Sequence, residues 1–108
     1  MRILSADHGG YSYGHSDHTY PRDYTIPFYA WGSGVARGAD LYQLNRATRR
    51  DPETKQIDYS PTDLQPIRNG DGANLALGLL GLRPIPDSSI NARQDLATDK
   101  AGASASGR

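Results

Sequence analysis

The chain of 108 residues has no cysteine, a single phenylalanine, a single tryptophan and no long apolar run. The absence of cysteine excludes disulfide bonds and zinc sites built from thiolates. No apolar stretch approaches the ~20 residues that cross a bilayer, and the first residues lack the pattern of a signal peptide. Lys and Arg total 12 and Asp and Glu total 12, so the charge does not indicate a surface for nucleic acid or an anionic membrane.

Glycine and polar residues dominate instead. The chain has 12 Gly and 7 Pro, and 36% of its residues are hydrophobic. This length and composition leave little apolar material for a self-sufficient core, so loops are expected to exceed regular structure. Residues 98–108 are rich in Ala, Gly and Ser and are predicted to be a disordered tail.

Two short stretches have the composition of β-strands. Residues 2–6 form the first; as a buried strand, they would place the residues that follow at the sheet edge where ligands collect. Residues 26–31 form the second, which is expected to begin at Pro27, because proline has no backbone donor, and to end before a Gly-Ser-Gly sequence. Trp31 is expected in the core.

One helix is clear in the sequence. It is predicted over residues 73–80, after candidate N-cap residues at 69–72, and Gly81 fits the left-handed position that ends many helices. Leucines surround this helix, so it requires burial between other elements, which a chain of this size is not expected to provide. The preceding segment is charged and turn-prone, with at most one helical turn at 40–44.

Arg68 lies just before this helix and admits two roles. It could clamp a phosphate, but beside a turn and a helix start a solvated or tail-pairing side chain is favoured. No substrate-binding residue is therefore assigned from the sequence.

All three histidines lie within the first 18 residues, beside a carboxylate and two glycines. Neighbouring side chains on a regular strand point to opposite faces, so Asp7 and His8 can share an ion only where the strand breaks. The two glycines that follow supply the break, because glycine tolerates positive φ and close backbone approach. Carboxylate and imidazole ligands suit zinc, manganese or iron. The pattern predicts a metal site of Asp7, His8 and one or both of His15 and His18, with zinc as the first choice.

An alternative interpretation gives the same residues structural roles without a metal. In it, Asp7 caps a turn, His8 is a partly buried histidine, and His15 and His18 are solvated loop residues. Three or four ligands would hold one ion, but a hydrolytic centre also needs an activated nucleophile. No serine or threonine here lies in a recognisable nucleophile motif, so the chain is expected to be one piece of a larger site.

Three segments resemble, in the expected order, the C-terminal part of the alkaline phosphatase superfamily, and most closely its type I phosphodiesterase and nucleotide-pyrophosphatase-like branch. The first is Ser5-Ala6-Asp7-His8-Gly9-Gly10 with Gly14-His15-Ser16-Asp17. The second is residues 26–35, and the third is residues 66–77 with the Pro-rich exit at 79–86. The likeness covers residues 1 to about 96. The order of the motifs weighs more than any one of them.

The resemblance implies an α/β fold. Residues 1–97 would be the C-terminal fragment of a doubly wound, alkaline-phosphatase-like sheet, loop-rich, with about two strands and one clear helix. It also implies two divalent metal ions, usually zinc, with manganese as an alternative. Asp7 and His8 would bind the metal that activates a Ser or Thr nucleophile. His15 would bind the second metal, with His18 as the runner-up.

The implied activity is metal-dependent hydrolysis of a small phosphate ester, of phosphodiesterase or phosphatase type, with sulfatase and phosphoglycerate mutase as sister chemistries. The family's nucleophile and remaining metal ligands are not among these residues. The resemblance therefore implies an inactive fragment whose partner is the missing N-terminal part of the same domain, in an enzyme that is extracytoplasmic. The alternative is a non-catalytic metal-binding or interaction module that folds with a partner.

Overall fold

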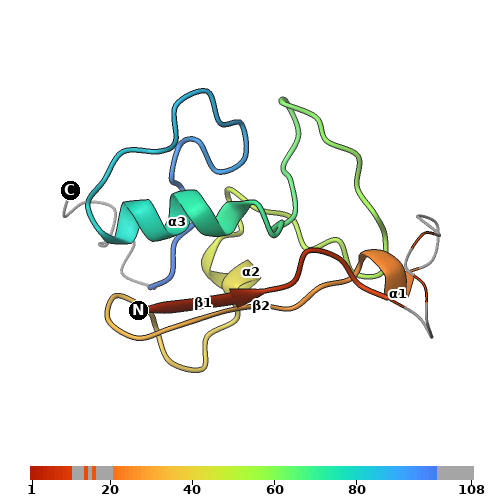
Figure 1. Cartoon of the computed structure of the whole chain (residues 1–108), viewed down its shortest axis with the longest axis horizontal. Helices are drawn as coiled ribbons and strands as arrows, with labels where there is room; N and C mark the ends of the chain where they lie inside the picture. Colours follow the sequence, from red (N-terminus) through yellow and green to blue (C-terminus); the bar gives the residue numbers. More distant parts are fainter. Residues whose placement is uncertain (11–13, 15, 17–20, 100–108) are drawn as a thin grey trace.

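The computed structural model describes residues 1–10, 14, 16 and 21–99 as a loop-rich, mixed α/β structure (Figure 1). Two short strands and three helices are connected by long irregular segments, which confirms the expected class and the excess of loops. In chain order they are β1 (Arg2–Ser5), α1 (Pro21–Tyr24), β2 (Phe28–Trp31), α2 (Leu41–Leu44) and α3 (Asp71–Leu79).

The two strands form an antiparallel pair. Arg2 lies opposite Trp31 and Ser5 opposite Phe28, so side chains alternate between two faces in a fixed register. Helix α3 lies along one face (Figure 1), where a Cβ placed at Gly72 would contact the side chain of Ile3 at 3.6 Å. The strand pair β1–β2, called the hairpin below although a long connection joins its strands, and α3 therefore form two layers. The end of β1 lies beside the start of the helix.

The other face of the hairpin is exposed. Leu4 is 53% exposed, Tyr29 59% and Trp31 46%. The predictions of a buried first strand and of a core tryptophan are therefore wrong. They fail because α3 covers one face of the strand pair, and no second layer from the described residues covers the other.

Helix α3 follows its local signals closely. It ends at Leu79, and Gly81 takes the left-handed conformation with φ +76°, as predicted. It begins at Asp71, two residues earlier than expected, because the Asp71 carboxylate accepts a 2.7 Å hydrogen bond from the Arg68 backbone N–H. Leu80, just past the end of the helix, is 67% exposed, which agrees with the expectation that a chain of this size does not cover the leucines on every side. The single turn α2 forms as expected, with the Asp40 side chain capping its start.

The interior is mostly polar. Within the described residues the buried hydrophobic side chains are Leu75 and Leu96, whereas Asp71, Asn74 and Thr98 are the largest fully buried ones. Polar side chains in such positions require hydrogen-bond partners. Arg49 and the Arg68 N–H supply them for Asp71, Gly34 O for Thr98, and the backbone of the segment that follows α3, which runs back over the helix (Figure 1), for Asn74.

Two buried amides attach this C-terminal segment. The Asn74 side chain donates to Ile90 O at 3.0 Å and accepts from the Ile85 N–H at 2.8 Å. The Asn45 side chain bonds both backbone groups of Ala97, donating to its carbonyl at 2.8 Å and accepting from its N–H at 2.6 Å. Thr98, where the predicted tail starts, is 2% exposed and donates to Gly34 O. Residues 100–108 lie outside the described part of the chain.

Arg49 is the charged centre of this interior. Its guanidinium donates to Asp71 at 2.8 Å, to Asp95 at 2.9 Å and to the side-chain oxygen of Asn91 at 3.1 Å. Burial by itself lowers the pKa of Arg49, but the hydrogen bonds to the two carboxylates outweigh it, so the pKa is raised above its ordinary value. Because Arg49 is buried and paired with two carboxylates, it links the start of α3 to the C-terminal segment.

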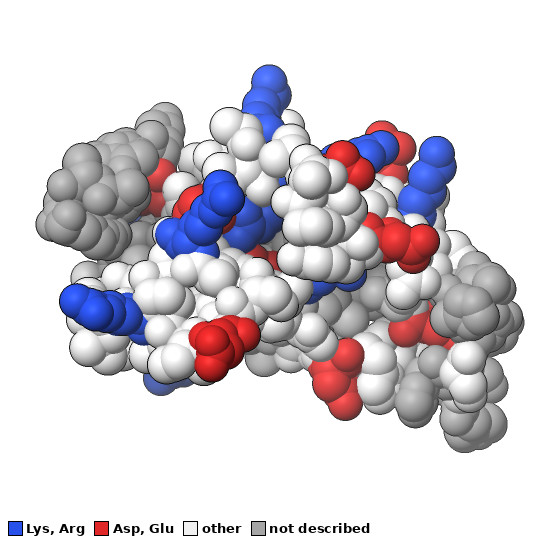
Figure 2. All heavy atoms as spheres, turned by 90° about the horizontal axis from the view of Figure 1, so that it is seen from above, with Lys and Arg blue, Asp and Glu red and all other residues white. Residues whose placement is uncertain are grey.

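Acidic and basic side chains are mixed on the outside. On the face drawn in Figure 2, Lys and Arg are interspersed with Asp and Glu, and neither sign forms a continuous patch. This distribution agrees with the balanced composition, which carries no net formal charge.

Candidate metal centre and adjoining cavity

Asp7 and His8 lie just beyond the last residue of β1, where the strand has ended. The Asp7 Oδ1 and the His8 Nε2 are 3.5 Å apart, and the two side chains are 88% and 45% exposed. Two ligands of a tetrahedral zinc, each bonded at ~2.0–2.1 Å, lie roughly 3.3–3.4 Å from each other. The observed separation is therefore close to that of two positions on one ion. The predicted break in the strand does bring these two side chains to the same side.

The His8 ring is oriented by its own backbone neighbourhood. Its Nδ1 lies 2.5 Å from Gly9 O. A carbonyl oxygen only accepts, so Nδ1 is the protonated nitrogen and donates this bond. Metal-binding histidines are commonly held in this way, with one nitrogen donating to a carbonyl and the other directed at the metal. Here the other nitrogen is Nε2, the atom next to the Asp7 carboxylate.

Gly9 and Gly10 join this loop to α1. Gly9 N donates to Asp23 O at 2.9 Å, and Gly10 N donates to Arg22 O at 2.6 Å. A Cβ at Gly9 would overlap Arg22 O and would lie 2.7 Å from Thr25 O. Neither glycine is among the positive-φ residues. Close backbone approach, rather than a left-handed conformation, is thus what requires glycine after His8.

Gly9→Ala is expected to destabilise the folded chain by about 1–3 kcal/mol, because the new methyl group has no room against the α1 backbone. The matched control is Gly10→Ala, whose Cβ would meet Gly14 O at an ordinary 3.5 Å. Urea unfolding followed by circular dichroism measures both variants. Equal midpoints for the two alanine variants would contradict the close approach at Gly9.

Asn69 connects the candidate metal ligands to the start of α3. Its side-chain nitrogen donates to Asp7 O at 2.9 Å and to Ala6 O at 3.2 Å. These two contacts join residues that are 62 and 63 positions apart in the sequence. The backbone that carries Asp7 is therefore held against the helix start as well as against α1.

His15 and His18, the two predicted loop ligands, lie outside the described residues. Within residues 1–10, 14, 16 and 21–99, no group of three or more His, Cys, Asp or Glu is placed to hold a metal ion. What the structure brings together from the predicted set is the pair Asp7 and His8.

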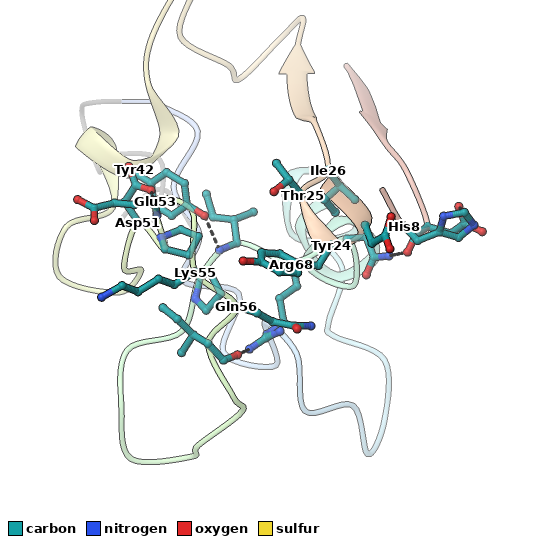
Figure 3. Close-up of a pocket in the computed structure, with 17 residues that line it drawn as sticks. His8, Tyr24, Thr25, Ile26, Tyr42, Asp51, Glu53, Lys55, Gln56 and Arg68 are labelled. Carbon is teal, nitrogen blue, oxygen red and sulfur yellow. Dashed lines mark hydrogen bonds and ion pairs between the residues drawn. The ribbon is translucent and has the colours of Figure 1, made fainter. Parts of the chain in front are cut away.

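A cavity of about 480 Å³ lies next to this pair. The strand-end loop, residues 23–26, the loop 51–57 and residues 66–69 line it (Figure 3). The ring of His8 lies at one edge of this view and points away from Tyr24 and Arg68, which are nearer its middle. Such a volume is within the ~300–1,000 Å³ range of small-molecule sites.

Two tyrosines support the walls of the cavity. The Tyr24 hydroxyl donates to Thr54 O, which holds the loop 51–57 against the end of α1. The Tyr42 hydroxyl accepts a 3.0 Å hydrogen bond from the Ile67 N–H. Burial raises the pKa of Tyr42 above its ordinary value, and the negative charges of Asp51 and Asp71 add to this, against an opposing contribution from the Ile67 bond. Tyr42 therefore stays neutral.

Arg68 is half-buried, so the prediction of a solvated side chain is wrong, whereas pairing with residues 100–108 lies outside the described part of the chain. Its Nη2 donates to Ile57 O at 2.7 Å and to the side-chain oxygen of Gln65 at 2.8 Å. The loop that supplies these acceptors has no motif beyond turn-forming prolines. Its return to the helix start left no signal in the sequence, which is why the cavity was not predicted.

No model of a known family, no curated protein and no solved structure matches this chain. The resemblance to the alkaline phosphatase superfamily therefore stays a prediction from the motifs. Among the described helices, none has both the length and the apolar character required to cross a bilayer.

Proposed function

We propose that this chain is part of a metal-dependent hydrolase of phosphate esters, of alkaline-phosphatase-like type, in which Asp7 and His8 hold a divalent cation. Zinc is the first choice, His15 the next ligand and His18 its alternative. The observation that carries the proposal is the 3.5 Å separation of the Asp7 Oδ1 and His8 Nε2 atoms at the end of β1. The adjoining cavity of about 480 Å³ supports it, because it leaves room for a small-molecule ester.

In this proposal the chain's own residues bind the cation and orient its ligands. Asp7 and His8 supply ligand atoms, the Gly9 carbonyl sets the His8 tautomer, and Asn69 holds the loop against α3. When bound, divalent cations would stabilise charge on phosphate oxygens and activate a nucleophile. The nucleophile and the remaining ligands would belong to the N-terminal part of the same domain.

The exposed hairpin face supports such a larger assembly. Strands covered on both faces are apolar in consecutive positions, as in Ile3-Leu4 and Phe28-Tyr29-Ala30-Trp31. Among residues 1–10, 14, 16 and 21–99, α3 covers one of these faces and nothing covers the other. A doubly wound sheet would cover the other with a second layer of helices.

Metal binding by the full chain tests the proposal. Asp7→Ala is expected to weaken zinc affinity by more than about 100-fold, since even partners outside the ligand set contribute about 10- to 100-fold. The control is Asp58→Ala, which removes an exposed carboxylate that does not line the cavity. His15→Ala and His18→Ala, measured in the same calorimetric titration, decide between the two loop histidines. Unchanged affinity in all three site variants would contradict a metal site here.

A second candidate is a non-catalytic metal-binding or interaction module that folds with a partner. It is favoured by the small apolar interior of Leu75 and Leu96 and by the exposed Leu4, Tyr29 and Trp31. Cobalt(II) in place of zinc separates the two candidates, because catalytic sites keep an open coordination position and structural sites do not. Inorganic phosphate should change the visible spectrum of the cobalt-loaded chain if the site is hydrolytic, and should leave it unchanged if the site is structural.

A further inference from the structure

Arg68 is a half-buried cation without an anionic partner in the described part of the chain. Arg49, by contrast, forms ion pairs with both Asp71 and Asp95. Arg68 bonds instead to two neutral oxygens, Ile57 O and the Gln65 side-chain oxygen. Its Nε is buried and has no hydrogen-bond partner. Leaving a buried donor of a charged group unpaired is costly, and a ligand that completes it recovers that cost.

The contrast with Arg49 shows what is missing at Arg68. Both guanidiniums are anchored by hydrogen bonds, but Arg49 contacts two carboxylates within 2.9 Å, whereas the acceptors of Arg68 are one backbone carbonyl and one amide oxygen. The charge of Arg49 is thus balanced by carboxylates of the chain itself. Arg68 has the same kind of anchoring at Nη2, whereas its Nη1 takes part in no hydrogen bond within the described residues. Its positive charge is available to a further anion.

The backbone of Arg68 is also held close to the segment that carries Asp7 and His8, although the His8 ring points away from Arg68 (Figure 3). Its backbone N–H donates to Asp71 at 2.7 Å, which fixes the residue at the helix start. The following residue, Asn69, donates to Asp7 O at 2.9 Å. Asp7, His8 and Arg68 all line the same cavity. A charge fixed in advance loses little freedom when it binds a ligand.

The arrangement of the cavity leaves room for an anion at Arg68. In Figure 3, Asp51 and Glu53 lie beside Tyr42 at one end of the view, and Arg68 lies between them and His8. Tyr24, Ile26 and the other apolar residues of the wall suit an organic group. Arg68 also borders a second hollow of about 420 Å³.

We propose that this cavity is the substrate site of the hydrolase proposed above, on which the inference rests, and that Arg68 binds the phosphate group of the ester. The ligand class is an organic phosphate ester whose carbon-bearing part packs against the wall that contains Tyr24 and Ile26. Guanidinium matches the oxygens of phosphate in geometry and charge, and it keeps its charge at every physiological pH.

The test is binding of phenyl phosphate to the full chain in EDTA, so that no metal takes part. The wild type is expected to bind with a Kd of about 1 mM. Arg68→Gln should weaken this binding about tenfold, and Arg68→Lys should restore part of it, because lysine keeps the charge but lacks the planar fork. The control is Arg83→Gln, which removes an exposed arginine that borders neither cavity and should bind like the wild type.

A measurement on the wild type guards against a variant that fails to fold. The Arg68 Nε–H signal in nitrogen-edited NMR should shift on addition of phenyl phosphate and stay in place with phenol, which has the ring but no phosphate. Arg68→Gln binding as tightly as the wild type, or an unmoved signal at saturating phenyl phosphate, would overturn the proposal. Because EDTA removes metal ions, this binding does not depend on the zinc affinity, which is measured separately on the same chain. If the wild type binds no zinc but still binds phenyl phosphate through Arg68, the result would therefore count against the metal site and not against Arg68.

Discussion

Arg49→Ala is expected to lower the free energy of unfolding by about 3–5 kcal/mol, the cost of breaking a buried ion pair by removing one partner. The Asp71 side chain is 2% exposed and would lose its 2.8 Å partner, while Asp95 and Asn91 would lose theirs. A typical domain is stable by about 5–15 kcal/mol, so this single change removes much of the total. Urea denaturation followed by far-ultraviolet circular dichroism measures the effect.

The matched control for this prediction is Arg46→Ala. Arg46 is three residues away, exposed, and bonds only to the side chain of Gln43 among the described residues. Its removal should change stability by less than about 0.5 kcal/mol, as for most surface substitutions. Equal losses in the two variants would show that the Arg49 ion pairs do not hold the C-terminal segment to α3.

Asn74→Ala is expected to cost about 2–4 kcal/mol, because two backbone groups lose their partners. The Asn74 amide is 1% exposed, and it satisfies the Ile85 N–H and the Ile90 carbonyl, which lie on separate parts of the segment after α3. A buried group left unpaired costs about 1–3 kcal/mol. Hydrogen exchange of the Ile85 amide reports the loss locally, and urea unfolding reports it globally.

Ser89→Ala is the control for the Asn74 variant. Ser89 lies in the same segment, is exposed, and makes no hydrogen bond to the described residues. It should exchange and unfold like the wild type. Faster exchange at Ile85 in the Ser89 variant, or unchanged exchange in the Asn74 variant, would assign the attachment of this segment to something other than the Asn74 amide.

Features encoded over a few residues were predicted well. The end of α3 followed from Gly81, and the single turn α2 followed from the local pattern. The break after β1 followed from the glycines, although space against α1 rather than positive φ is the reason for Gly9. Asp7 and His8 meet at that break because they are consecutive and the strand has ended.

Features that depend on distant contacts were missed. Arg49 meets Asp71 and Asp95 across 22 and 46 positions, and no pattern in the sequence pairs these charges. Arg68 is withdrawn from solvent by a loop that reaches it from Ile57 and Gln65. Trp31 is apolar, but its exposure is decided by which face of the hairpin α3 covers.

By itself, the sequence determined the class of the structure, its excess of loops, the end of its one long helix and the juxtaposition of a carboxylate with an imidazole after the first strand. These follow from backbone geometry and from residues close together in the chain. Tertiary structure alone decided that the interior is polar, that Arg49 is neutralised and Arg68 is not, and that a cavity opens beside Asp7 and His8. The reason is that burial and charge pairing belong to positions in space, and here segments separated by tens of residues supply the partners.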